Sequence, residues 1–137
     1  MRIVIDSNRV VASLLKDSTT RAILFNETFE FLAPEYVRED VVAHSAELMK
    51  KLKVRAKEFD ALVAMVFDHI TLVRSAEYNP LMRKLHHEIS DIKDIPFLAC
   101  CITTHSVGIW SHDPHMREQK RVKVLTNIDM LQQNKTA

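Results

Sequence analysis

The chain has 137 residues, of which 47% are hydrophobic and 27% charged, and this balance is typical of one globular domain rather than of a disordered or fibrous protein. The net charge of +1 creates no whole-molecule field for nucleic acid, so such a partner would have to bind through a local patch. Cys100 and Cys101 are the only cysteines, which excludes a disulfide framework and favours a reducing compartment. No apolar run is long enough to cross a bilayer, and Asp6 and Asn8 interrupt any signal-peptide core, so we expect a cytoplasmic protein with no membrane contact.

Apolar periodicity predicts strands that alternate with helices along the chain. Short apolar runs predict strands at residues 3–5, 29–33, 70–73, 107–111 and 122–125. Helical spacing predicts helices at residues 9–16, 18–25, 34–52, 59–70, 79–89 and 96–101, a helical turn at 114–119 and a closing helix from residue 126. Such alternation predicts a mostly parallel sheet with helices on both faces. We expect one domain over residues 1–131 and a frayed tail at 132–137.

Two of the predicted helix starts depend on proline, whose missing N–H is harmless in a first turn. Pro34 is expected to open the helix of residues 34–52, and Asn79-Pro80 the helix that follows the third strand. The first of these helices has an apolar stripe, in which His44 is expected to be a residue at the boundary of the core. The stripe consists of Val37, Val41, His44, Leu48 and Leu52.

Polar side chains follow two of the apolar strands directly. Asp6, Ser7 and Asn8 come after the first strand, and Ser111, His112 and Asp113 end the fourth. In open α/β sheets, ligands bind outside the carboxyl ends of the strands, so acids there are well placed for chemistry. Asp6 or Ser7 can instead simply cap the helix that follows.

Further acids lie next to helices that cover the sheet. Asp91 and Asp94 precede Pro96 and an apolar helix; one of them can cap this helix, which leaves the other for a site. On the helix of residues 34–52, Asp40 and Glu47 flank the apolar stripe, whereas Glu39 lies nearly opposite it and is expected to be solvated.

These acids would converge if the first and fourth strands are neighbours. Asp6 and Asp113 would then lie side by side, joined by Asp94 and Asp40 from the covering helices. Several carboxylates close together need a cation, and oxygen ligands select Mg²⁺ or Mn²⁺. Such a site supports phosphodiester hydrolysis by a metal-activated water, with Asn8 or Ser111 orienting a water or a carboxylate.

Three motifs together resemble the PIN domain family, which includes the VapC-type toxins. They are Asp6-Ser7-Asn8 after an apolar strand, Asp94 before Ile-Pro-Phe-Leu-Ala, and Ile109-Trp110-Ser111-His112-Asp113. The resemblance extends from Ile3 to about Leu131. It implies a three-layer α/β/α fold and Mg²⁺- or Mn²⁺-dependent ribonuclease activity on RNA. It also implies homodimers and, for toxin members, an antitoxin protein as partner.

The same resemblance assigns roles to residues of this chain. Asp6, Asp94 and Asp113 match the family's acidic positions, Asp91 an accessory acid, and Ser111 the hydroxyl residue two before the last acid. The sequence departs from the pattern at Asp40, where the family has glutamate, so Glu47 is an alternative ligand. Ser7 stands where threonine is usual and keeps the hydroxyl. The missing glutamate leaves a second interpretation open, a nucleic-acid-binding or partner-binding module with weak or no activity.

Two further patterns lie near the last acid. His112 and His115 form an H-x-x-H pattern, but structural zinc needs four ligands and no companion pair is present. His112, Arg117 and Lys120, with Arg121 and Lys123 nearby, would border the acids and meet RNA phosphates, although exposed Lys and Arg are also common without a ligand.

Overall fold

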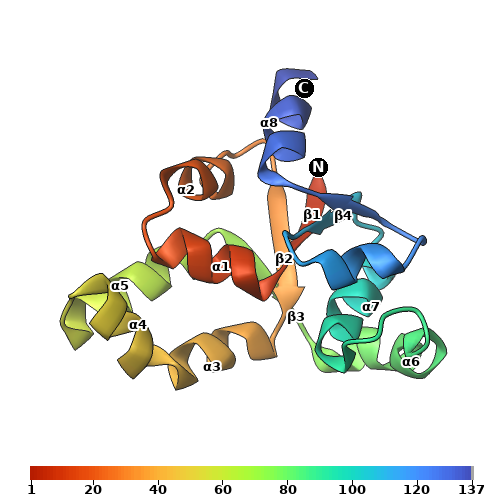
Figure 1. Ribbon diagram of the computed structural model, residues 1–137, viewed down its shortest axis with the longest axis horizontal. Helices are drawn as coiled ribbons and strands as arrows, with labels where there is room; N and C mark the ends of the chain where they lie inside the picture. The colour runs from red at the N-terminus through yellow and green to blue at the C-terminus, as the bar shows by residue number, and fades with distance from the viewer. Residues whose placement is uncertain (137) are drawn as a thin grey trace.

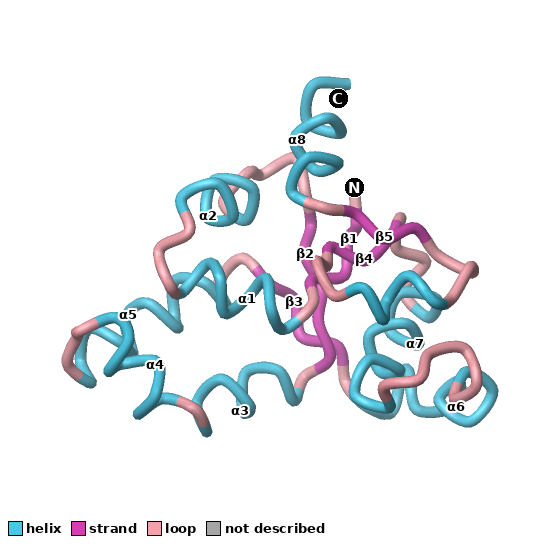
Figure 2. The backbone as a smooth tube through the Cα atoms, in the orientation of Figure 1, coloured by secondary structure: helices cyan, strands magenta, loops and turns pink. Residues whose placement is uncertain are grey.

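A computed structural model describes residues 1–136, with side chains up to residue 133. Its centre is a parallel five-stranded sheet with the order β3-β2-β1-β4-β5 (Figures 1 and 2). The strands are β1 (Arg2–Ile5), β2 (Glu30–Pro34), β3 (Ile70–Val73), β4 (Gly108–Trp110) and β5 (Lys123–Leu125). All five predicted strands are therefore confirmed, and the sheet is entirely parallel.

Helices cover both faces of this sheet, which confirms the three-layer α/β/α architecture. In Figure 1, α6 and α7 lie on one side, and α1, α3, α4 and α5 on the other. The 3₁₀ turns Ile92–Asp94 and Pro114–Glu118 precede α7 and β5. The helices are α1 (Ser7–Leu14), α2 (Ser18–Leu24), α3 (Tyr36–Ala43), α4 (Ser45–Leu52), α5 (Ala56–Phe67), α6 (Ser75–Leu85), α7 (Ile95–Thr103) and α8 (Asn127–Thr136).

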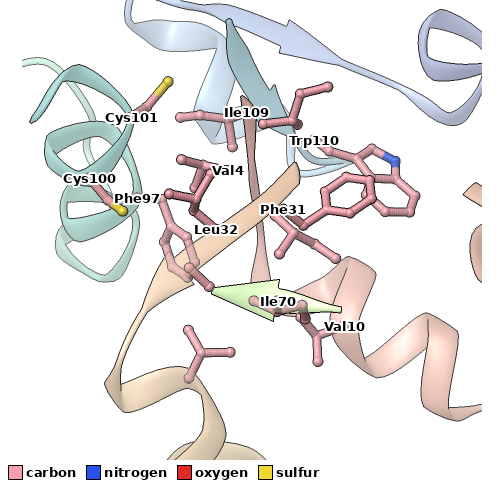
Figure 3. Close-up of a cluster of buried hydrophobic side chains, with 14 of the residues drawn as sticks. Val4, Val10, Phe31, Leu32, Ile70, Phe97, Cys100, Cys101, Ile109 and Trp110 are labelled. Carbon is pink, nitrogen blue, oxygen red and sulfur yellow. The ribbon is translucent and has the colours of Figure 1, made fainter. Parts of the chain in front are cut away.

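The apolar run of β1 is the middle of the hydrophobic core. Ile3, Val4 and Ile5 are fully buried, as a central strand covered on both faces requires. Figure 3 shows Val4 and its neighbours turned towards α7, with Phe31 and Trp110 on the opposite face. The rings of Phe31 and Trp110 lie 5.2 Å apart between centroids. This packing fixes β1 between β2 and β4 and so fixes where its polar end emerges.

The only glycine of the chain lies where β4 meets β5. A Cβ at Gly108 would be 2.7 Å from the carbonyl oxygen of Lys123, closer than real contacts allow. Glycine therefore permits the close approach of β5 to β4.

The predicted helix of residues 34–52 begins at the wrong residue and is not continuous. Pro34 is the last residue of β2 and pairs with Val73, a position at a strand end that proline tolerates. The helix after it begins at Tyr36 and is interrupted at His44, where α3 ends and α4 begins. His44 is exposed rather than part of the core boundary, and its Nδ1 lies 2.8 Å from the carbonyl oxygen of Asp40. Because the apolar spacing continues through this break, the sequence pattern predicts one helix where the structure has two.

Helix α6 begins at Ser75, four residues before the predicted start at Asn79-Pro80. The carboxylate of Glu77 accepts a hydrogen bond from the N–H of Arg74 at 3.2 Å, and Pro80 lies inside the helix. The local cap thus determined the start, and the proline did not.

The described residues contain no helix that is long and apolar enough to span a membrane. Cys100 and Cys101 are buried free thiols, consistent with the absence of a disulfide framework. Helix α8 continues to Thr136, past residue 131 where we expect the domain to end, and Ala137 lies outside the described residues.

Candidate metal centre

The carboxyl ends of β1 and β4 meet at one edge of the sheet. The two strands are parallel neighbours in which Ile5 is paired with Trp110. The N–H of Asp6 donates to the carbonyl oxygen of Trp110 at 3.0 Å, so the polar segments that follow both strands leave the sheet together. The adjacency that the sequence interpretation required is therefore present.

Ser111 connects these two segments. Its hydroxyl donates a 2.5 Å hydrogen bond to Oδ2 of Asp6 and accepts one of 3.0 Å from the N–H of Asp113. Ser111 is 1% exposed, so these bonds form away from solvent and hold the two acids in a fixed relation. Oδ1 of Asp6 accepts a further bond of 2.7 Å from the N–H of Ser7.

Asp94 lies close to Asp6 and Asp113 but comes from the turn that precedes α7. It ends the 3₁₀ turn that precedes α7, and the buried apolar face of α7 fixes its position. The residue is only 6% exposed, yet its Oδ2 has no hydrogen-bond partner among the described residues. An unpaired buried carboxylate oxygen is costly and needs an explanation.

Asp6, Asp94 and Asp113 form one group, which we call the three-acid cluster. One carboxylate oxygen from each lies within 4.8 Å of the others. The cluster opens into a cavity of about 690 Å³ whose lining also includes Ser7, Asn8 and Asp91. A ligand that enters this cavity would meet all three acids.

The electrostatics of the cluster favour a bound cation. Burial and the neighbouring Asp113 and Asp6 raise the pKa of Asp94 to about 7. Burial also raises the pKa of Asp6, although the hydrogen bonds from Ser111 and Ser7 oppose this rise. A positive charge among these carboxylates would reverse both effects by stabilising their ionised forms.

Helix capping explains some of these acids but not all. Asp6 caps α1 through the N–H of Ser7, and Asp91 and Asp113 cap the two 3₁₀ turns through the N–H groups of Lys93 and His115. Each of these hydrogen bonds uses one carboxylate oxygen, so capping and ligand binding are compatible. Asp94 makes no capping hydrogen bond. It is the acid whose burial the capping interpretation leaves unexplained.

Asp91 lies beside the three-acid cluster in a different group. Asp91, Asp94 and a ring nitrogen of His115 lie within 4.8 Å of one another. The H-x-x-H pattern does not form a site of its own. Nε2 of His112 accepts a hydrogen bond from the N–H of Asn127 at 3.1 Å, whereas Nδ1 of His115 lies 3.1 Å from Oδ1 of Asp113.

The predicted nucleic-acid-binding residues lie on the other side of Ser111. Ser111, His112 and Arg117 line a smaller cavity of about 210 Å³. Arg117 also lines a shallow depression with Lys120, and both side chains belong to exposed residues. Burial and the nearby Arg9 lower the pKa of His112, which favours a neutral ring. Positive charge in this region therefore comes from the arginine and the lysine.

Comparison with known proteins agrees with these observations. A family model described as PIN domain matches residues 4–133. The chain belongs to the PIN domain family. PIN domains are generally nucleases and typically use a divalent metal, so the chain has a nuclease-type fold. No curated protein matches the chain.

The residues of this PIN domain fit a divalent cation. The donor set is carboxylate oxygen, which Mg²⁺ and Mn²⁺ prefer. The unpartnered Oδ2 of Asp94 is the kind of orphaned atom that a cation would satisfy. Asp6, Asp94 and Asp113 are thus the residues that could hold the ion.

Asp40 differs from the other predicted acids. It lines the cavity of the three-acid cluster but is absent from the group whose oxygens lie within 4.8 Å of one another. Its side chain is 57% exposed and lies 4.0 Å from Nδ1 of His44. The alternative ligand Glu47 pairs with Lys51 at 3.4 Å and is not among the described residues that line this cavity. Glu39 is exposed and likewise outside the lining, as expected.

Two residues at the cavity have no signal in the sequence. Tyr36 begins α3, lines the cavity and makes a long hydrogen bond of 3.5 Å to the carbonyl oxygen of Lys93. Burial raises the pKa of Tyr36, as do the nearby acids, so its hydroxyl stays protonated as a donor. Lys93 also lines the cavity, and its backbone carbonyl oxygen is the acceptor for Tyr36. Both positions depend on how α3 and α7 pack, which local patterns do not encode.

Proposed function

We propose that this PIN domain is a metal-dependent endoribonuclease that cleaves RNA phosphodiester bonds with Mg²⁺ or Mn²⁺. The observation that carries the proposal is the three-acid cluster, whose carboxylate oxygens lie within 4.8 Å of one another at the carboxyl ends of neighbouring parallel strands. Three buried or half-buried carboxylates this close repel one another unless a cation is bound. The unpartnered oxygen of Asp94 supports the same interpretation.

In this proposal Asp6, Asp94 and Asp113 hold the cation. When bound, the cation supplies an activated water and stabilises the charge that develops on the phosphodiester. Ser111 keeps Asp6 and Asp113 in register through its two hydrogen bonds. Asn8 and Ser7 line the cavity and are the supporting polar groups, while Asp40 contributes from the rim.

Cations next to Ser111 support a nucleic-acid substrate, and RNA is the substrate that the resemblance of the sequence to the PIN family implies. Arg117 lies between the cavity that contains Ser111 and the depression that contains Lys120, so a phosphate chain leaving the acids would meet both side chains. The neutral ring of His112 would contribute a hydrogen bond rather than a charge. We expect the double variant Arg117→Ala, Lys120→Ala to bind RNA more weakly and with a smaller salt dependence, without a change in which sequences it prefers.

The decisive experiment is cleavage of single-stranded RNA by the purified chain with Mn²⁺, with and without a chelator. We expect cleavage with Mn²⁺, none with the chelator, and a loss of at least about a hundredfold in Asp94→Asn. Asp60→Asn is the matched control, because Asp60 is an exposed acid of α5 that does not line the cavity. Cleavage that resists the chelator, or full activity in Asp94→Asn, would overturn the metal mechanism.

A second candidate is a nucleic-acid-binding or partner-binding module with a weak site. The observation that favours it is the position of Asp40, which lies at the rim outside the three-acid cluster. RNA binding without cleavage under any divalent cation would establish this alternative. A toxin role with an antitoxin partner, and a homodimer, stay predictions; co-purification with a small protein encoded beside this chain would test the first, and light scattering the second.

A further inference from the structure

The cavity that contains the three-acid cluster is also lined by apolar side chains. Tyr36, Ile92, Pro96 and Phe97 belong to this lining, and we call them the apolar wall. They come from the start of α3, from the 3₁₀ turn Ile92–Asp94 and from the first turn of α7. Ligand sites commonly combine apolar and aromatic surface with a few polar groups that fix orientation. The proposed function uses the acids of this cavity and gives the apolar wall no role.

Tyr36 provides the aromatic surface of the apolar wall. Its ring and that of Phe97 lie edge to face, with 6.2 Å between centroids, and Phe97 is only 2% exposed. The buried ring of Phe97 therefore fixes the orientation of Tyr36, which itself stays half-buried at the cavity. Burial and the nearby acids raise the pKa of Tyr36, so its ring is uncharged at neutral pH.

Ile92 extends the apolar wall into solvent. It is 76% exposed, more than any other large apolar residue of the described chain. The turn that contains it is held by the carboxylate of Asp91, which accepts the N–H of Lys93 at 3.0 Å, so the fold does not need an apolar side chain at Ile92. Single exposed apolar residues are common, but this one shares a cavity lining with Tyr36 and the acids. A ligand in the cavity would cover it.

A nucleobase is the ligand that fits both the acids and the apolar wall. A phosphodiester at the acids has a base attached through one sugar, and the base is the part of an RNA strand that has an apolar face. Asp40 and Asp91 line the same cavity and would repel a second phosphate, whereas the amino groups of a base can donate hydrogen bonds to carboxylates. Proteins that bind single strands use tyrosine and other aromatic rings as surfaces on which bases stack.

We propose that the apolar wall binds the unpaired base of a nucleotide next to the scissile phosphodiester, and that this base stacks on the ring of Tyr36. The inference deepens the proposed function and rests on it, because it names an unpaired nucleotide as what the nuclease requires of its substrate. A base inside a duplex is paired and stacked between its neighbours, so it has to leave the duplex before it can lie on the wall.

Binding of two strands of equal charge tests the inference without reference to cleavage. One is an oligoadenylate of about eight nucleotides, and the other has the same sugar-phosphate backbone without bases. Both carry a fluorescent end label, and their dissociation constants are measured by anisotropy with the full chain at low salt. A chelator is present so that the strands stay intact. The oligoadenylate paired with its complement is the third probe.

Four variants separate the ring from other contributions. Tyr36→Leu removes the aromatic ring, and Tyr36→Phe removes only the hydroxyl. Ile92→Ser changes a side chain that is exposed, so folding should be preserved, which the thermal midpoint checks. Val42→Ser is the matched control, because Val42 is an exposed apolar residue of α3 that does not line the cavity.

We expect the wild type to bind the oligoadenylate at least about tenfold more tightly than the strand without bases. This ratio should fall at least about fivefold in Tyr36→Leu, because stacking on the ring is lost, and by a smaller factor in Ile92→Ser. Tyr36→Phe and Val42→Ser should keep the ratio of the wild type. The paired strand should bind no more tightly than the strand without bases.

The outcomes that overturn this inference differ from those that overturn the proposed function. Equal binding of the two single strands, no binding of either, or a ratio unchanged in both Tyr36→Leu and Ile92→Ser would overturn the base site. So would a paired strand that binds as tightly as the single one. Mn²⁺-dependent cleavage would leave the proposed function standing in each of these cases. A ratio that depends on Tyr36, without cleavage under Mn²⁺, would instead overturn the proposed nuclease and leave the apolar wall as the base-binding surface of a binding module.

Discussion

The hydroxyl of Ser111 donates a hydrogen bond of 2.5 Å to the carboxylate of Asp6, although 105 residues separate them in the chain. The same hydroxyl accepts the N–H of Asp113, so one small side chain joins the ends of two strands. Because Ser111 and Asp6 are 1% and 3% exposed, water does not compete for these bonds. The spacing of Asp6 and Asp113 in the three-acid cluster therefore depends on a residue that need not itself contact a bound cation.

Replacement of Ser111 by alanine should loosen this arrangement. The N–H of Asp113 and one oxygen of Asp6 would lose their partner, so we expect the free energy of unfolding to fall by about 1 to 2 kcal/mol. Mn²⁺ affinity should fall roughly 10- to 100-fold, as for other residues that orient a ligand. Ser90→Ala is the control, because the Ser90 hydroxyl binds Glu118 at the surface. Equal effects of both changes on Mn²⁺ affinity would contradict the role of Ser111.

The raised pKa of Asp94 predicts how stability depends on pH without metal. Its pKa is about 7 in the folded chain against 3.8 ordinarily, so between these values the folded chain binds more protons than the unfolded chain. This site therefore stabilises the folded state at low pH, and the contribution is lost as pH rises towards 7. Asn does not titrate, so the free energy of unfolding of Asp94→Asn should not show this loss.

The corresponding measurement is urea unfolding of wild type and Asp94→Asn with a chelator present. The variant's advantage in free energy of unfolding should grow by about 2 kcal/mol between pH 5 and pH 8. Added Mn²⁺ should stabilise the wild type at pH 8 and the variant much less. An advantage that does not change with pH would show that the Asp94 carboxyl is not strained by burial.

Asp40 should contribute less than the three-acid cluster. Because its side chain is 57% exposed and lies outside the cluster, Asp40→Asn should lower RNA cleavage by less than about tenfold, well below the effect of Asp6→Asn. Asp40→Glu adds one methylene and should raise Mn²⁺ affinity, since the longer chain reaches further into the cavity. Glu39→Gln is the control on the same helix. A loss in Asp40→Asn as large as in Asp6→Asn would mean that Asp40 is a direct ligand.

Gly108 should be intolerant of any side chain. In Gly108→Ala the new methyl group would meet the carbonyl oxygen of Lys123 at 2.7 Å, and this oxygen belongs to backbone that cannot rotate away. We expect a loss of about 1 to 3 kcal/mol in unfolding by urea. Ala99→Gly, in α7, provides a second destabilised variant in which β4 and β5 stay in register. A Gly108→Ala protein as stable as the wild type would show that β5 can move away.

The layers of the fold were predictable because short apolar runs indicate strands of a covered sheet. Ile3 to Ile5, in the middle of the sheet, are buried on both faces. Ile70 to Val73 form the edge strand β3, in which Thr71 is exposed and Leu72 is half-buried. Helix ends were less predictable, because His44 breaks a helix without interrupting its apolar spacing. The predictions at Pro34 and Pro80 were wrong for a related reason. A proline lacks an N–H donor, and this alone does not indicate whether it lies at a strand end or inside a helix.

The three acids of the cluster could be predicted because each follows or precedes a strongly apolar element. That these acids lie close together could not be predicted, because it depends on β1 and β4 being neighbours in the sheet. The prediction that one of Asp91 and Asp94 caps the apolar helix α7 was wrong: Asp91 caps the 3₁₀ turn before it, and Asp94 is buried at the start of α7 without a capping hydrogen bond. His115 had only a weak signal, because its carboxylate neighbours come from a turn whose shape no periodicity encodes.

The most direct test of the central claim is a crystal structure of the chain soaked with Mn²⁺, with anomalous scattering used to locate the ion. We expect a peak at the cavity, with carboxylate oxygens of Asp6, Asp94 and Asp113 at roughly 2.0 to 2.3 Å from the ion. Crystals of Asp94→Asn should lack it. A cavity without a peak at saturating Mn²⁺, or a peak bound by none of these three acids, would contradict the account.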